Sequence, residues 1–145
     1  MKKLLSIRNT AMNLLARREH SASELLQKLK QRDHAEEDIL KAIEELQADN
    51  LQSDARFTES FINQRVNAGY GPIKIRHDLR NRGVNQDLVD AYLGPFQDGW
   101  FERMSEQRIR KFGVEIPYEY ALKMKQARFL QNRGFSPESV MRLFR

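Results

Sequence analysis

The sequence predicts an all-α protein, built as an elongated array of three tandem three-helix modules of the helix-turn-helix kind. The first reason is an internal repeat: residues 79–93 recur in the same register at 130–144, with a weaker copy at 29–43. Apolar residues also recur at steps of three and four, while the alternation typical of strands is absent. Self-similarity at a spacing of about 50 residues is typical of arrays of small modules. Such arrays expose a long surface, which favours binding over catalysis.

The first predicted module covers residues 1–52. Its opening helix is marked by one apolar stripe: Leu4, Ile7, Ala11, Leu14 and Leu15. Ser21 and Glu24 have the spacing of a capping box, in which hydroxyl and carboxylate each accept a hydrogen bond from a backbone amide. The capping box predicts the start of a second helix, and a third is expected at about residues 36–48 from its own apolar stripe.

The second and third predicted modules cover residues 53–97 and 98–145. Glycine predicts where their helices end, because it adopts the left-handed conformation that follows a helix: Gly69, Gly83, Gly113 and Gly134. Pro72 and Pro137 fit the first turn of a helix, and Asn85 and Ser136 fit capping positions. Each module is therefore expected to have a tight turn before its third helix. The inner face of the second helix of the third module is expected to carry Tyr120, Met124, Ala127 and Leu130.

Composition narrows the functional classes. The chain of 145 residues has 31% charged residues, no cysteine and a net charge of +5. Residues 97–145 alone hold ten Lys and Arg against six Asp and Glu, so the last third is the basic part. No apolar run reaches the length of a membrane span, and the absence of cysteine excludes disulfides. We expect a cytoplasmic protein without a membrane partner.

No catalytic arrangement is found. The three histidines are not spaced as metal ligands, and the glycines do not form a phosphate-binding loop. The serines lack the context of an activated nucleophile. We therefore predict no enzyme activity, no metal and no cofactor.

Basic residues are the better functional signal. Arg76 and Arg80 lie four apart and would share one helical face. Tyr70, in a glycine-flanked turn, is the aromatic residue expected to touch a partner. The full set of predicted contact residues is Arg17, Arg18, Arg65, Tyr70, Arg76, Arg80, Arg108, Arg110, Lys111, Lys123, Lys125 and Arg128. A set of unconnected surface arginines remains the alternative. Arg82 and Arg133 each precede a helix-ending glycine, where a structural role at the helix terminus is equally expected.

Several motifs resemble the bacterial RecX regulatory family. They are Ser-Asp-Ala-Arg-Phe-Thr-Glu-Ser-Phe-Ile at 53–62, the segment 71–84 around Ile-Arg-His-Asp-Leu-Arg-Asn-Arg-Gly, and the segments 14–21 and 129–136. The resemblance covers residues 7–145 in the expected order. One departure is Arg32-Asp33-His34, which stands where the family has a glycine-containing turn, and it predicts a looser turn in the first module.

The resemblance implies a cytoplasmic negative modulator of the RecA recombinase, with a part in DNA repair and the SOS response. Such proteins bind RecA filaments on single-stranded DNA, lie in the helical groove, block extension and limit strand exchange, ATP hydrolysis and co-protease action. Single-stranded DNA and duplex DNA are further implied partners, and we expect a monomer. The alternative is a helix-turn-helix transcription regulator. The helix that would read bases in the middle module carries Asp87 and Asp90, which argues against it.

Overall fold

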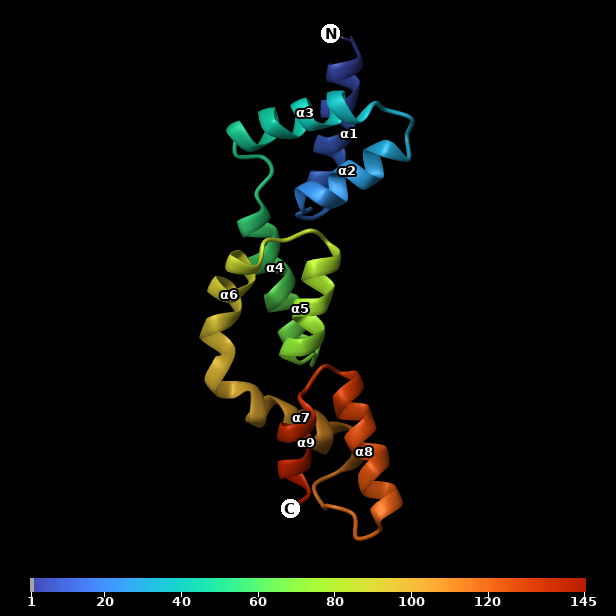
Figure 1. Ribbon diagram of the computed structural model, residues 1–145, viewed down its shortest axis with the longest axis vertical. Helices are drawn as coiled ribbons and strands as arrows, with labels where there is room; N and C mark the ends of the chain where they lie inside the picture. Colours follow the sequence, from blue (N-terminus) through green and yellow to red (C-terminus); the bar gives the residue numbers. More distant parts are fainter. Residues whose placement is uncertain (1) are drawn as a thin grey trace. The chain divides into compact units, whose positions relative to one another are not determined.

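A computed structural model describes residues 2–145, with side chains from Leu5 onward, so the side chain of Leu4 lies outside the described part. The described residues form helices and no strand, which confirms the all-α prediction. The helices are α1 (Lys2–Arg17), α2 (Ala22–Lys30), α3 (Glu36–Ala48), α4 (Asp54–Asn67), α5 (Pro72–Asn81), α6 (Gln86–Leu93), the 3-10 helix η1 (Gly94–Gly99), α7 (Trp100–Phe112), α8 (Tyr120–Asn132) and α9 (Pro137–Leu143) (Figure 1). Within residues 2–145 no helix is both long and apolar enough to cross a membrane.

The first three helices enclose a core of their own. Their buried side chains come from the stripes expected for each helix: Ile7, Ala11 and Leu14 on α1, Leu25 and Leu29 on α2, and Ile39, Ala42, Ile43 and Leu46 on α3. The predicted capping box opens α2, because the Ser21 hydroxyl accepts from the Glu24 amide and the Glu24 carboxylate accepts from the Ser21 amide. This core fixes the start of α2, which is where the next module docks.

The chain forms two compact units, Met1–Phe61 with Leu79–Val89, and Ile62–Asp78 with Asp90–Arg145. The predicted module boundaries after residues 52 and 97 stay a prediction. Both units draw residues from α4, α5 and α6. The reason is that a turn of one module docks on the start of a helix in the module before it. We call residues 81–83 and 132–134, which share the sequence Asn-Arg-Gly, the docking turns.

The first docking turn rests on the start of α2. The Ser21 hydroxyl donates a 2.8 Å hydrogen bond to the Arg82 carbonyl. Gly83 has a φ of 73°, and a Cβ on it would lie 2.5 Å from the Cβ of Ser23. Glycine is therefore required here for two reasons: the left-handed backbone and the close approach to Ser23.

The second docking turn rests on the start of α5 in the same manner. The Gly71 amide donates to the Arg133 carbonyl at 2.7 Å, and the Ile73 amide donates to the Gly134 carbonyl at 3.0 Å. Gly134 has a φ of 102°, and a Cβ on it would lie 2.5 Å from the Cβ of Lys74. In both docking turns the carbonyl of the arginine accepts a hydrogen bond from the residue just before a helix. The repeated Asn-Arg-Gly sequence is thus the link between neighbouring modules.

The corresponding turn of the first module shares only part of this geometry. The Val84 and Phe135 amides donate to the Leu79 and Leu130 carbonyls, whereas among the described residues no matching bond runs from His34 to Leu29, so the expectation of a looser turn stays a prediction. Asp33 has a φ of 64°, the same left-handed conformation that glycine adopts in the docking turns. Asp33 is exposed, so its side chain has room that residues 83 and 134 lack. Aspartate is one of the few side chains that tolerate this backbone conformation.

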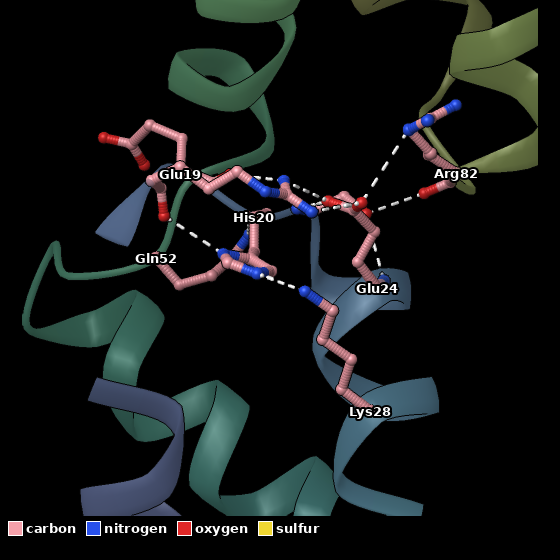
Figure 2. A network of polar contacts seen from close by, with 8 residues as sticks. Glu19, His20, Glu24, Lys28, Gln52 and Arg82 are labelled. Carbon is pink, nitrogen blue, oxygen red and sulfur yellow. Dashed lines mark hydrogen bonds and ion pairs between the residues drawn. The ribbon is translucent and has the colours of Figure 1, made fainter. Parts of the chain in front are cut away.

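A polar network lies beside the first docking turn (Figure 2). The Glu24 carboxylate accepts hydrogen bonds from both terminal nitrogens of the Arg18 guanidinium, at 3.2 and 3.0 Å. It also forms an ion pair with Arg82 at 3.7 Å. Burial alone would raise the pKa of the Glu24 carboxyl, but the hydrogen bonds from Arg18 and Ser21 outweigh it and lower that pKa. An ionised Glu24 therefore holds the docking turn through Arg82.

His20 is buried at the centre of this network. Its Nε2 lies 2.8 Å from the Lys28 ammonium, and its Nδ1 lies 3.0 Å from the Arg18 carbonyl. An ammonium can only donate, so Nε2 is the acceptor and Nδ1 carries the proton. Burial, together with the charges of Arg18 and Lys28, lowers the pKa of His20, so the ring is neutral near pH 7.

Candidate filament and nucleic-acid interface

Tyr70 stands at the centre of a group of cations between α4 and α5. The guanidinium carbons of Arg133 and Arg65 lie 4.9 and 5.5 Å from its ring centroid, and the Lys74 ammonium lies at 5.8 Å. We call these four residues the Tyr70 cluster. Cations are attracted to the face of an aromatic ring. Arg65 and Tyr70 are two of the predicted contact residues, and the structure brings them together. Lys74 was not predicted, and Arg133 was expected to have either a contact or a structural role.

Arg133 ties the Tyr70 cluster to the second docking turn. Its guanidinium donates to the Ala68 carbonyl at 3.1 Å, near the end of α4. Its backbone carbonyl accepts from Gly71 at 2.7 Å. Arg133 therefore has a structural role, which was the alternative to contact with a partner. With Arg65, Lys74 and Arg133 against its ring, Tyr70 is a poor platform for a stacked base.

A small polar hollow of about 180 Å³ adjoins the Tyr70 cluster. Tyr70, Gly69 and Asn67 form part of its wall, and α7 contributes Arg103, Glu106, Gln107 and Arg110. Two of the predicted residues, Tyr70 and Arg110, thus line one surface. Arg110 is exposed in the last turn of α7, so its charge faces solvent there.

Arg76 and Arg80 are both on α5, as predicted, but they differ in surroundings. The Arg76 guanidinium forms a 2.6 Å ion pair with Asp90 of α6, which partly neutralises it. Arg80 is exposed in the last turn of α5. At the end of α1, Arg17 is exposed, whereas Arg18 is held by Glu24. Arg17 and Arg80 are therefore the better placed of these four for an outside partner.

Arg108 is buried, so its placement on a binding surface was wrong. Only 4% of the residue is exposed, and it lies one turn from Met104 on the inner face of α7. Its guanidinium donates to the Val114 carbonyl at 2.8 Å, and to the Glu115 carbonyl and the Gln126 side chain at 3.3 Å each. Arg108 thus holds the connection between α7 and α8 instead of meeting a partner.

The other predicted cations of the third module lie toward solvent. Lys111, Lys125 and Arg128 are exposed and Lys123 is half-buried. The Lys111 ammonium lies 5.6 Å from the Phe129 ring centroid, where the face of the ring attracts a cation. Among the residues that the structure describes, no group of His, Asp and Glu is arranged to hold a metal ion.

Tyr120 was expected on the inner face of its helix, and that expectation was wrong. It is the first residue of α8 and is 74% exposed, because the module's buried core starts further along the helix, at Ala127 and Leu130. Tyr118, just before it, is fully exposed. The signal in the sequence was the apolar residue at every second position from Val114 to Tyr120.

The fold and these residues define a protein of tandem three-helix modules with basic surfaces. Comparison with known proteins agrees. Models of the first, second and third three-helix domains of RecX match residues 8–46, 53–93 and 98–144. "Regulatory protein RecX" of Pseudomonas entomophila is 44% identical over 139 residues, covering 96% of this chain and 90% of the relative. That of Legionella pneumophila is 39% identical, covering 94% and 91%.

Solved structures share the fold. A crystal structure of regulatory protein RecX matches with a TM-score of 0.81 at 22% identity, over 94% of this chain and 70% of the other. RecX from Lactobacillus salivarius matches with a TM-score of 0.79 at 21% identity, over 99% and 95%. The chain belongs to the RecX family of regulatory proteins. The tandem arrangement of three helical domains is thereby confirmed.

Proposed function

We propose that this chain is a cytoplasmic, monomeric negative modulator of RecA. It binds RecA filaments on single-stranded DNA along the helical groove and blocks their extension. It limits strand exchange, ATP hydrolysis and co-protease action, and thereby acts in DNA repair and the SOS response. Membership of a family of regulatory proteins supports this role. We propose no catalytic activity for it.

The observation that carries the proposal is the pair of docking turns. Each links one three-helix module to the next through the same arginine carbonyl and a glycine without space for a side chain. Modules joined in this repeated way suit a polymer, because successive modules can meet successive subunits. Exposed cations such as Arg80, Arg110 and Lys125 would meet DNA phosphates or acidic protein groups.

A helix-turn-helix transcription regulator was the alternative, and no observation favours it. The third helix of the middle module, α6, carries Asp87 and Asp90 on its exposed side. The charge of Asp87 would repel DNA phosphates in a groove, and Asp90 is paired with Arg76 and not available to read bases. A sequence-specific footprint on duplex DNA would be the evidence for that function.

The test is a titration of RecA ATPase activity on single-stranded DNA. We expect the ATPase rate to fall when this protein is present at less than one copy per RecA, because blocking filament ends affects many subunits. An unchanged rate at equimolar protein would contradict the proposal.

Charge-reversal variants locate the surface. Arg80→Glu and Arg110→Glu should each raise the concentration needed for half-inhibition and reduce its dependence on salt, because fewer counterions are released. Lys41→Glu makes the same charge change at an exposed position of α3 and serves as the control. Equal losses in all three variants would show a general effect of net charge instead of a defined surface.

A further inference from the structure

The connection between α7 and α8 exposes an unusual run of apolar side chains. Tyr118 is 100% exposed, Val114 and Tyr120 are each 74% exposed, and Ile116 is 47% exposed. Single exposed apolar residues are ordinary, but four of them at alternate positions of one short segment indicate a surface that another molecule covers. This run includes two aromatic rings.

The same connection is held in one conformation by a buried cation. Arg108 donates to the carbonyls of Val114 and Glu115, and the Gln126 side chain accepts a third hydrogen bond. Burying a guanidinium is costly unless it is hydrogen-bonded; here the two terminal nitrogens are bonded, while the buried Nε has no partner among the described residues. The three bonds tie the connection to α7 and α8. A loop that is already ordered loses less conformational entropy when a ligand binds.

Tyr120 also forms part of the wall of an open hollow of about 560 Å³ on α8 and α9. The remaining lining is mainly apolar and comes from Ala121, Met124, Ala127 and Met141. Arg128 and Gln131 are its two polar side chains. That volume lies in the range of small-molecule sites. Apolar walls with a few polar groups suit a flat heteroaromatic ring such as a nucleobase.

The charge around the hollow indicates the partner. Lys123, Lys125 and Arg128 follow Tyr120 along α8, while Glu115 and Glu119 are the acidic residues of the connection. The last third of the chain is also the basic part. Aromatic side chains beside cations are typical of sites for single-stranded nucleic acid, where bases stack on rings and phosphates meet positive charge. A duplex keeps its base faces stacked internally and cannot use the rings.

We propose that Tyr118, Tyr120 and the hollow beside Arg128 form a site for unpaired bases of single-stranded nucleic acid. The site rests on the proposed function in that the strand would be the DNA of a RecA filament. Tyr118 and Tyr120 stack on bases, and Arg128 contacts the sugar-phosphate backbone. The Tyr70 cluster does not take this part, because its ring is occupied by the chain's own cations.

The test measures fluorescence anisotropy of a labelled oligothymidylate with the full chain and without RecA. We expect Tyr118→Ala and Tyr120→Ala each to weaken binding by about tenfold, the size of one lost base stack. Tyr118→Phe and Tyr120→Phe keep the ring and are expected to bind as the parent does. Because both tyrosines are exposed, all four variants should unfold at the parent's urea concentration.

Three results would overturn this site. The first is absence of binding to the oligothymidylate by the parent. The second is equal affinity of the alanine variants and the parent. The third is equally tight binding of a duplex of the same length that shows the same tyrosine dependence. The ATPase titration is separate, so a chain that inhibits RecA but fails here retains the proposed function and loses only this site.

Discussion

The Ser21 hydroxyl donates a 2.8 Å hydrogen bond to the Arg82 carbonyl, across 61 residues of sequence. The Gly71 amide makes the equivalent bond to the Arg133 carbonyl. One acceptor in a repeated Asn-Arg-Gly turn is therefore used twice, by a side chain in one place and by the backbone in the other. This contact should therefore contribute to the stability of the chain.

Gly83→Ala should strongly destabilise the chain. An L-residue in the left-handed conformation costs about 1–2 kcal/mol, and overpacking against Ser23 adds about 1–3 kcal/mol. We expect the free energy of unfolding from urea denaturation to fall by about 2–5 kcal/mol. In a double-mutant cycle, Ser23→Gly should reduce that loss, because it removes the Cβ that lies 2.5 Å from the added one. Independent, additive effects of the two substitutions would contradict the close approach.

Asp33→Gly should behave in the opposite sense. Asp33 has a left-handed backbone and is exposed, so glycine there relieves strain without losing a packed side chain. We expect the free energy of unfolding to stay the same or rise by up to about 1 kcal/mol. A clear loss of stability in urea would mean that the Asp33 side chain itself holds the turn.

Ser21→Ala should cost more than Ser136→Ala, although both serines cap helices. Loss of a cap costs about 1 kcal/mol in either case. Ser21 is also buried and donates to Arg82, so its loss leaves the Arg82 carbonyl, in a partly buried contact, without this donor, at about 1 kcal/mol more. Urea denaturation of both variants, followed by circular dichroism, measures the difference. Equal losses would show that the hydrogen bond to Arg82 contributes nothing.

The network around His20 should make stability depend on pH. In the unfolded chain His20 titrates at its ordinary pKa of 6.5, whereas in the folded chain the pKa is lower. Below 6.5 the unfolded state therefore binds more protons, and the free energy of unfolding falls as pH drops from 6.5 toward the folded pKa. The Glu24 pKa is also lowered, so a second loss follows as pH falls below 4.5 toward its folded pKa.

Urea midpoints measured between pH 5 and 8 check the first of these losses. Lys28→Met removes a cation 2.8 Å from the His20 ring, so protonation becomes easier in the folded state and the pH dependence should shrink. His20→Gln should abolish the slope near neutral pH. A slope that persists in His20→Gln would have to come from another group.

Arg108→Met should release the connection between α7 and α8. The variant leaves the Val114 and Glu115 carbonyls and the Gln126 side chain without their cationic donor, at a cost of about 2–3 kcal/mol. We expect faster cleavage by chymotrypsin after Tyr118 under native conditions. Arg110→Met, two residues away and exposed, should change neither stability nor cleavage.

Local features of this fold could be predicted from the sequence. The capping box of Ser21 and Glu24 and the cap at Ser136 are confirmed, because they depend only on residues within one turn of a helix. The repeat also predicted the tandem modules. The role of Gly83 could be predicted only in part: its left-handed backbone follows from its position, but its contact with Ser23 depends on how two modules dock.

The candidate site was predicted less well, for identifiable reasons. Arg108 was placed on the surface because charge usually means exposure, yet it shares the inner face of α7 with Met104. Tyr120 was placed inside because its spacing fits a helical stripe, but the first turn of α8 extends past the core. Only the packed structure shows that the buried Arg108 holds the connection that leads to the exposed Tyr120.

Asp33 has a consequence for assembly. A turn of this shape with a glycine could settle on the start of a helix in another copy, and such head-to-tail contacts do not close on themselves but grow into fibres. A Cβ at Gly83 has no space against Ser23, so a side chain such as that of Asp33 would clash in a contact of the same geometry. We therefore expect the aspartate to disfavour head-to-tail association through the first turn.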